Sequence, residues 1–226
     1  MSSIDKPAHA IEIFLQPGEV YFGERNTRIR TLLGSCVAIT MWHPNLLVGG
    51  MCHYMLPKRN GKKQGKLMEQ QAIRQGEQAT PAKSLVMDGR YADEAMELML
   101  RDIMQAGTLP REYQVKLFGG GHMFSGHQAV SEDHVGAKNV EMARVLMKRH
   151  GFSSCAEHLG GVGHRNIIFD IWSGDVWVRH QPPVTPEHSG IGKNAHAITG
   201  APKHIPEAMA KLAFNQFGWC KKLLNA

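Results

Sequence analysis

Two apolar runs separated by a turn constrain this chain more than any other feature of its sequence. The runs cover residues 36–42 and 46–56, and residues 43–45 between them read His-Pro-Asn. Short apolar runs rich in valine and isoleucine are typical of buried strands, and a Pro-Asn sequence is typical of a turn. The sequence therefore predicts a β-hairpin with Cys36 at the start of one strand and His53 near the end of the other.

A cysteine and a histidine on neighbouring strands can form a reactive pair. Antiparallel strands bring side chains close together, and an imidazole within reach can take the proton of a thiol whose pKa is ordinarily about 8.5. The resulting thiolate attacks acyl groups, and the histidine returns the proton to the leaving group. Gly34 and Ser35 lead tightly into Cys36, which can aim backbone N–H groups at an oxyanion. The alternative is structural, because an isolated cysteine or histidine is more often a buried core residue.

A second thiol, Cys52, lies directly beside His53 in the sequence. Side chains alternate along a strand, so these two neighbours are expected to face opposite ways. If His53 faces Cys36, Cys52 points into the other layer of the protein.

Six motifs follow one another along the chain and carry a family resemblance. They are LLGSCVAITMWHP, GGMCHYMLP, GRYADEAM, FGGGHMF, VGAKNVE and LGGVGHRNIIFDIWSGDVWVR, and together they cover most of residues 20–179. The series resembles the CheD family, the chemoreceptor glutamine deamidases of bacterial chemotaxis. LGSCV followed by GGMCH at this spacing is the most specific part of the resemblance, and it favours the reactive interpretation of the Cys–His pair.

The resemblance implies hydrolysis of glutamine side chains on receptor signalling helices to glutamate by a Cys–His–Thr triad. Cys36 matches the nucleophile and His53 the base. The third member is a threonine shortly before the cysteine, for which Thr31 is the candidate, although Thr27 lies on the same approach. A threonine can orient the imidazole through a hydrogen bond but carries no charge. Neither a metal nor an organic cofactor is expected.

Two glycine-rich segments are placed near the site by the same resemblance. Gly120 and Gly121 belong to a triple glycine that lacks the ending of a phosphate-binding P-loop. His164 and Arg165 follow the second segment. We expect substrate contacts from these four residues, although structural turns are an equally good interpretation of the second segment.

The pattern of elements predicts an α+β fold with mixed or antiparallel sheets and outer helices. The resemblance adds a layered α/β sandwich similar to cysteine-dependent toxin deamidases. We expect one domain over residues 1–180 with a mobile insertion at about 58–81, a linker over 181–204 and a C-terminal amphipathic helix over 205–226. Helices are predicted at 91–105 and 134–150, and further strands at 10–15, 18–23, 114–118, 152–159, 167–171 and 175–179.

Composition limits the classes of protein to which the chain can belong. The chain has 226 residues, 42% of them hydrophobic, a formal charge of +6 and four cysteines, too few for a disulfide framework. No apolar run is long enough to span a bilayer and no secretion signal is visible, so we expect a cytoplasmic protein without membrane insertion. Five basic residues within 58–66 form either a solvated loop or a guide for an acidic partner. No nucleic-acid motif is recognisable.

Two other functions compete with the deamidase. The first is a metal-dependent hydrolase that uses histidine and cysteine ligands, although no recognised ligand motif is present. The second is a non-catalytic chemotaxis adaptor, because the resemblance also implies binding to the receptor or to a CheC-type phosphatase. The candidate ligands for the first are Cys52, His53, Cys155, His158 and His164.

Overall fold

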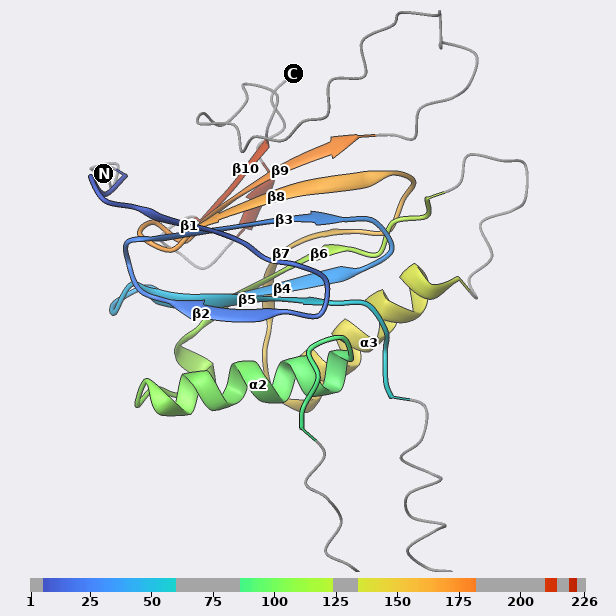
Figure 1. Ribbon diagram of the computed structural model, residues 1–226, viewed down its shortest axis with the longest axis horizontal. Helices are drawn as coiled ribbons and strands as arrows, with labels where there is room; N and C mark the ends of the chain where they lie inside the picture. Colours follow the sequence, from blue (N-terminus) through green and yellow to red (C-terminus); the bar gives the residue numbers. More distant parts are fainter. Residues whose placement is uncertain (1–5, 60–85, 124–133, 182–209, 215–219, 223–226) are drawn as a thin grey trace, which may run out of the picture.

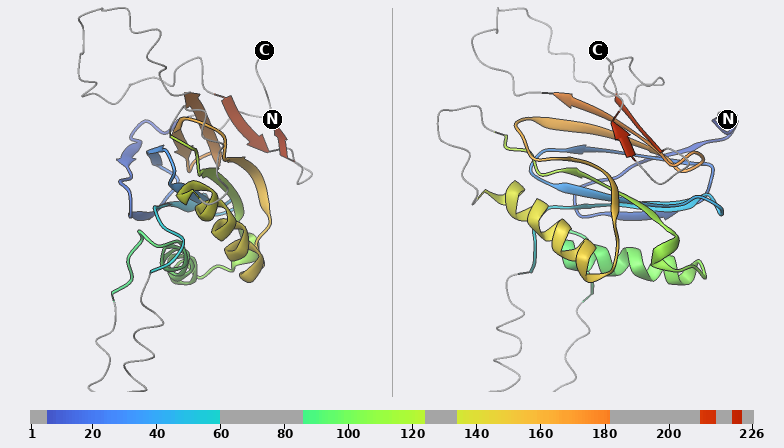
Figure 2. Two further views of the ribbon diagram at one scale, coloured as in Figure 1. Left: turned by 90° about the vertical axis from the view of Figure 1, so that its right-hand side faces the viewer. Right: turned by 180° about the vertical axis from the view of Figure 1, so that it is seen from behind.

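The protein is built in three layers, a sheet on a sheet on a pair of helices (Figure 1). The structure is a computed structural model, which describes residues 6–59, 86–123, 134–181, 210–214 and 220–222. Both α-helices of this described part lie on the side of the second sheet that faces away from the first, as the views in Figure 2 show from two further directions. The predicted α+β class with mixed sheets and outer helices is confirmed.

The first sheet, sheet A, has six strands and is almost entirely antiparallel. Only β1 and β3 run parallel to each other. The order across the sheet is β1 (Ile11–Phe14), β3 (Thr27–Leu33), β8 (His164–Asp170), β9 (Asp175–Gln181), β10 (Ala210–Phe214) and β11 (Cys220–Lys222).

The second sheet, sheet B, has five strands and contains the predicted hairpin. Only β6 and β7 run parallel to each other. The order is β2 (Val20–Gly23), β5 (Val48–Tyr54), β4 (Val37–His43), β6 (Gln114–Gly119) and β7 (Ser154–Leu159). Sheet B is covered on both faces, by sheet A and by the helices, which explains why its strands read as continuous apolar runs rather than as alternating ones.

The helices form where apolar residues recur at helical spacing, as predicted. In α2 (Ala92–Gln105) the buried side includes Ala95, Met96, Met99 and Ile103. In α3 (Val135–Arg149) it includes Val140, Ala143 and Leu146, and His134 caps the N-terminus by accepting the Ala137 amide at 3.3 Å. A short 3₁₀ helix, η1 (Pro110–Glu112), leads into β6. None of the helices in the described ranges is long and apolar enough to cross a membrane.

The two faces of sheet B lie in two separate hydrophobic cores. The helix-facing core contains Val37, Ile39, Cys52 and Tyr54 from the hairpin, together with the buried sides of α2 and α3. The core between the two sheets contains Ala38 and Met51 from the hairpin, Phe118 from the neighbouring strand β6, and Ile29, Leu33 and Ile167 from the facing strands of sheet A. Alternate residues of β4 and β5 therefore enter different cores.

The β4–β5 hairpin requires glycine at two adjacent positions. A Cβ at Gly49 would lie 2.4 Å from the Met41 carbonyl oxygen, and one at Gly50 would lie 2.5 Å from the Tyr21 carbonyl oxygen. The strands on both sides of β5 therefore approach too closely for any side chain here. The turn extends further than the three predicted residues, because β5 begins only at Val48 and Leu47 has a positive φ of 52°.

The predicted C-terminal helix is wrong where the structure describes this segment. Residues 210–214 form β10, which pairs antiparallel with β9, and β11 pairs with β10. The free edge of β9 presents unpaired backbone N–H and C=O groups, and pairing with that edge outweighs a helical pattern in the sequence. The predicted linker lies outside the described residues beyond Gln181, and so does the predicted insertion beyond Arg59.

Candidate active site

The hairpin places Cys36 and His53 on the same face of sheet B. In the β4–β5 register Ala38 lies opposite His53, and Cys36 lies two residues before Ala38. Cys36 is therefore a diagonal neighbour of His53 across the two strands. Its half-buried side chain packs against the core between the sheets, the core that contains Ala38.

Cys52 faces the opposite way, as predicted, and is fully buried in the helix-facing core. Burial raises the pKa of its thiol to about 12. At neutral pH this thiol stays protonated, so Cys52 is a core residue and not a competing nucleophile.

Thr31 reaches His53 from the facing sheet. The Thr31 Oγ1 atom lies 2.7 Å from His53 Nδ1 and 2.8 Å from the Leu15 carbonyl oxygen, to which it donates. A hydroxyl has one proton, and Thr31 donates this proton to the Leu15 carbonyl oxygen. In the hydrogen bond with His53, the donor must therefore be the Nδ1–H group of the imidazole. This assigns the tautomer with hydrogen on Nδ1 and a lone pair on Nε2. The alternative residue, Thr27, lies beside Gly23 at the other end of β3.

The free lone pair of His53 lies in a buried position. Nε2 has no hydrogen-bond partner among the described residues, and the whole side chain is 1% exposed. Burial lowers the pKa of His53 to about 4, against smaller opposing effects of the Leu15 carbonyl and the Glu19 charge. The imidazole is therefore neutral at pH 7 and can accept a proton at Nε2.

The Cys36 thiol is neutral in the resting protein as well. Burial raises its pKa above the ordinary value, and a hydrogen bond from its own backbone N–H opposes this effect. The pair therefore rests as thiol and imidazole rather than as thiolate and imidazolium. A neutral thiol and a neutral imidazole permit general-base activation, in which proton transfer accompanies attack on an acyl group.

The loop that leads into Cys36 is held by the triple glycine. The Gly121 amide donates to the Gly34 carbonyl at 2.8 Å, and the Gly120 amide donates to the Cys36 carbonyl at 2.7 Å. Gly120 has a φ of 68°, and a Cβ there would lie 2.2 Å from a Val140 methyl group. Gly120 and Gly121 thus support the loop that leads into Cys36, a role that the sequence did not predict. Their contact with substrate stays a prediction.

Arg165 and His164 lie on opposite faces of β8. Arg165 is 1% exposed; its Nε donates to His158 Nδ1 at 2.7 Å and its Nη2 to the Gly160 carbonyl. Burial lowers its pKa, and its Nη1 is buried without a partner among the described residues. His164 instead contacts Gln181 at 2.7 Å. The structure therefore does not bring His164 to the face that carries Thr31.

One buried polar residue beside the pair was missed by the sequence analysis. Asn139 on α3 is fully buried, and its Nδ2 donates to the carbonyls of Ser35 at 3.0 Å and Met55 at 2.8 Å. The available signal was an asparagine within VGAKNVE on the inward stripe of an otherwise apolar helix. Sequence spacing alone could not show which backbone groups it would contact.

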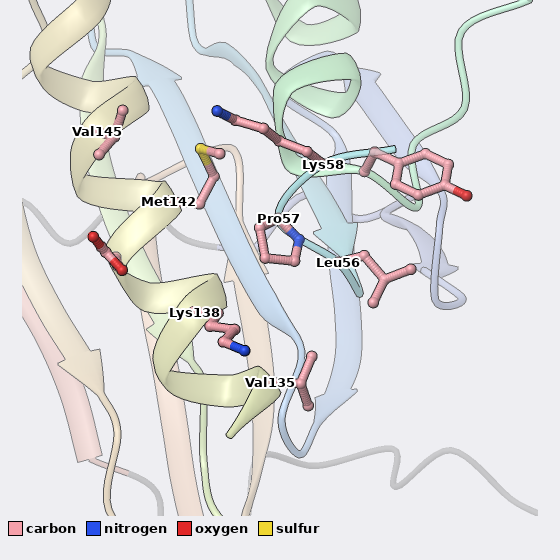
Figure 3. A pocket seen from close by; sticks show the side chains of 9 residues that line it. Leu56, Pro57, Lys58, Val135, Lys138, Met142 and Val145 are labelled. Atoms are coloured by element: carbon pink, nitrogen blue, oxygen red, sulfur yellow. The ribbon is translucent and has the colours of Figure 1, made fainter. Parts of the chain in front are cut away.

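A groove opens where the chain leaves β5 (Figure 3). It has a volume of about 710 Å³ and lies between α3 and the segment of residues 56–58. Leu56 and Val135, on opposite sides of the groove, are 41% and 39% exposed, so its rim is partly apolar. The groove begins three residues after His53. The described residues contain no cluster of three or more His, Cys, Asp or Glu that could hold a metal ion.

Comparison with known proteins agrees with the motifs. The sequence model described as CheD chemotactic sensory transduction matches residues 55–180. The chain belongs to the CheD family. A CheD relative from Pseudomonas savastanoi pv. phaseolicola, named a probable chemoreceptor glutamine deamidase, is 48% identical over 84% of this chain and 97% of the relative.

Two further CheD relatives carry the same descriptive name. The protein from Pseudomonas syringae pv. tomato is 49% identical over 78% of this chain and 94% of the relative. The one numbered CheD 1 from Leptospira interrogans is 36% identical over 81% of this chain and 98% of the relative. The match therefore extends along nearly the full length of each of these CheD proteins.

Proposed function

We propose that this chain is a cysteine-dependent protein-glutamine glutaminase that converts specific glutamines of methyl-accepting chemotaxis receptors to glutamate and so tunes chemotaxis signalling. Its relatives are named for this activity. The observation that carries the chemistry is the hydrogen bond between Thr31 and His53, which leaves the Nε2 lone pair free on the face of the hairpin that carries Cys36.

The first half of the reaction forms a thioester. His53 Nε2 takes the thiol proton as Cys36 Sγ attacks the side-chain carbonyl carbon of the glutamine. Backbone N–H groups of the Gly34-Ser35-Cys36 loop stabilise the oxyanion. The C–N bond then breaks, the Nε2 proton passes to the nitrogen, and ammonia leaves.

The second half of the reaction returns the enzyme to its starting state. His53 Nε2 takes a proton from water, and the hydroxide attacks the thioester carbonyl. The C–S bond breaks, the sulfur regains its proton from Nε2, and the substrate leaves with a glutamate side chain. Every proton is carried by His53 and no redox step occurs.

Thr31 acts by fixing the imidazole. Its hydroxyl is held by the Leu15 carbonyl, so it presents a lone pair to the Nδ1–H group. When His53 becomes positively charged during the reaction, this chain of two hydrogen bonds polarises toward the Leu15 oxygen. A carboxylate in this place would instead favour the charged form at rest. The uncharged partner is therefore consistent with a neutral resting pair.

The family and the chemistry support the proposed substrate and location. The receptor parts to be modified are the cytoplasmic signalling helices, and a thiol nucleophile functions in the reducing cytoplasm. A CheC-type phosphatase is a further proposed partner, which rests on the family resemblance alone.

The test is peptide mapping of a receptor cytoplasmic fragment after incubation with the protein, beside Cys36→Ala and His53→Ala. We expect conversion of particular glutamines to glutamate, with release of ammonia, by the unmodified protein alone. No conversion across several receptor fragments, with binding retained by both the unmodified protein and Cys36→Ala, would instead support the non-catalytic adaptor.

A further inference from the structure

Asn139 joins the two segments that carry the reactive pair. Its single Nδ2 group donates to the carbonyl of Ser35, which precedes Cys36, and to the carbonyl of Met55, which lies two residues after His53. Both hydrogens of this amide are therefore used, one on each segment. The asparagine holds the nucleophile loop and the end of β5 at a fixed separation.

The three carbonyls around the nucleophile are held in two different ways. Those of Gly34 and Cys36 accept backbone amides from the triple glycine, at 2.8 and 2.7 Å. The Ser35 carbonyl is held by the side chain of Asn139. A substitution at Asn139 can therefore release the central peptide of the loop while the backbone bonds on both sides remain.

The Ser35–Cys36 peptide gives this contact a chemical consequence. A trans peptide is planar, and its C=O and N–H groups point in opposite directions. No peptide bond in the described residues is cis. Because Asn139 draws the Ser35 oxygen toward α3, the Cys36 N–H points away from α3.

Stability alone gives a poor reason for asparagine at this position. Asn139 is fully buried, and its Oδ1 has no hydrogen-bond partner among the described residues. An unpaired buried carbonyl is unfavourable, and an apolar residue of similar volume would avoid that cost. The two hydrogen bonds of Nδ2 are what an apolar residue could not provide.

We propose that Asn139 is a positioning residue for the reaction, which holds the Cys36 N–H at the site of the oxyanion and keeps the Cys36 sulfur within reach of His53. This inference rests on the proposed function. Asn139 touches neither substrate nor the reacting atoms, and acts through the Ser35–Cys36 peptide and through Met55.

The test compares Asn139→Asp and Asn139→Ala with a matched control. Aspartate keeps the volume and adds a charge, whereas alanine leaves a space and adds none, so loss of the Nδ2 donor is their shared effect. The control is Tyr54→Phe, which removes the Tyr54 hydroxyl that donates to the backbone carbonyl of Asn139 at 2.7 Å. The control loosens the same junction and leaves the Nδ2 contacts in place.

Two readouts are needed, with the folded state checked by thermal melting. For receptor glutamine deamidation we expect kcat to fall about 10- to 100-fold in both Asn139 variants with KM nearly unchanged, because small displacements of reacting groups have effects of this size. For iodoacetamide alkylation, followed on the Cys36 peptide by mass spectrometry, we expect a slower rate in both. Tyr54→Phe should lower the melting temperature and leave both readouts near the unmodified values.

Several outcomes would overturn the proposal. Either Asn139 variant with unmodified kcat and alkylation rate would do so, as would a loss in Tyr54→Phe as large as that in the Asn139 variants. If one Asn139 variant fails to fold, the other decides. If the unmodified protein deamidates no receptor fragment, the proposed function fails, and the alkylation rates still test whether Asn139 positions Cys36.

Discussion

The two faces of the β4–β5 hairpin differ in what they do, although they are made from alternate residues of the same strands. One face carries Cys36 and His53 toward sheet A, where Thr31 meets the imidazole. The other carries Cys52 and Tyr54 into the helix-facing core. Adjacent residues in sequence, Cys52 and His53, thus enter different layers of the protein. We propose that only the thiol on the face toward sheet A is reactive.

Alanine substitution should distinguish the two thiols of the hairpin most strongly. Cys36→Ala should lower kcat for deamidation about 10⁴- to 10⁶-fold, since removal of a nucleophile has effects of this order. Cys52→Ala should leave kcat near the unmodified value and lower the free energy of unfolding by about 1 kcal/mol, because it opens a small space in a packed core. Steady-state ammonia release and urea denaturation measure the two quantities. Equal losses of activity in the two variants would remove the distinction between the faces.

The next effect separates the two threonines of β3, both of which are 2% exposed. Thr31→Val keeps the shape but removes the acceptor for His53 Nδ1, so the imidazole loses its fixed tautomer and orientation. We expect kcat to fall about 10- to 100-fold. Thr27→Val is the control at the far end of the strand and should leave kcat unchanged. A Thr31→Val enzyme as active as the control would show that the hydrogen bond has no role in the reaction.

A third effect is the dependence of stability on pH, which comes from the buried base. The pKa of His53 is about 4 in the folded protein, below its ordinary value of 6.5. As pH falls, the unfolded chain therefore takes up a proton on His53 at a higher pH than the folded protein does. The contribution of neutral His53 to the free energy of unfolding is complete above pH 6.5 and is lost as pH falls toward 4. The loss should be on the order of 3 kcal/mol, measured by urea denaturation across this range.

His53→Gln provides the control for this pH dependence, because glutamine has no proton to gain. Between pH 6.5 and 4 its free energy of unfolding should fall less than that of the unmodified protein. The difference between the two falls should equal the contribution of His53. Parallel curves for the two proteins would contradict a buried, neutral His53.

The smallest effect is a difference in stability between the two faces of β8, where Arg165 faces the interior and His164 faces outward. Arg165→Met removes the hydrogen bonds to His158 and Gly160 and should lower the free energy of unfolding by about 1–3 kcal/mol. His164→Ala should change it by less than about 0.5 kcal/mol, as is usual for partly exposed positions. Thermal melting of the two variants checks this order, and the reverse order would contradict the assignment of faces.

The hairpin and the helices were predictable because their signals are local. Apolar runs, a Pro-Asn turn and helical spacing are all contained within short segments, and alternation alone placed Cys52 away from His53. The family resemblance already identified Thr31 as the candidate third member of the triad. Its contact with His53 was not available from spacing, because β3 and β5 belong to different sheets and meet only when the layers pack.

The features that sequence analysis missed depend on distant parts of the chain. Residues 210–214 form a strand because β9 offers an open edge, which no local pattern reveals. Asn139 lies on a stripe predicted to be core, and its partners belong to two loops far away in sequence. The triple glycine similarly holds the Cys36 loop through backbone groups, and backbone contacts leave no signature in side-chain pattern.

We propose that acyl transfer occurs at Cys36, on the side of the hairpin that faces sheet A. The decisive test is acid quenching of a reaction with a receptor fragment, followed by mass spectrometry of the cysteine peptides. We predict a glutamyl thioester on the Cys36 peptide and none on the Cys52 peptide, and the adduct should be absent in His53→Ala. An adduct on Cys52 or Cys155, or continued turnover by Cys36→Ala, would contradict the assignment of Cys36 as the nucleophile.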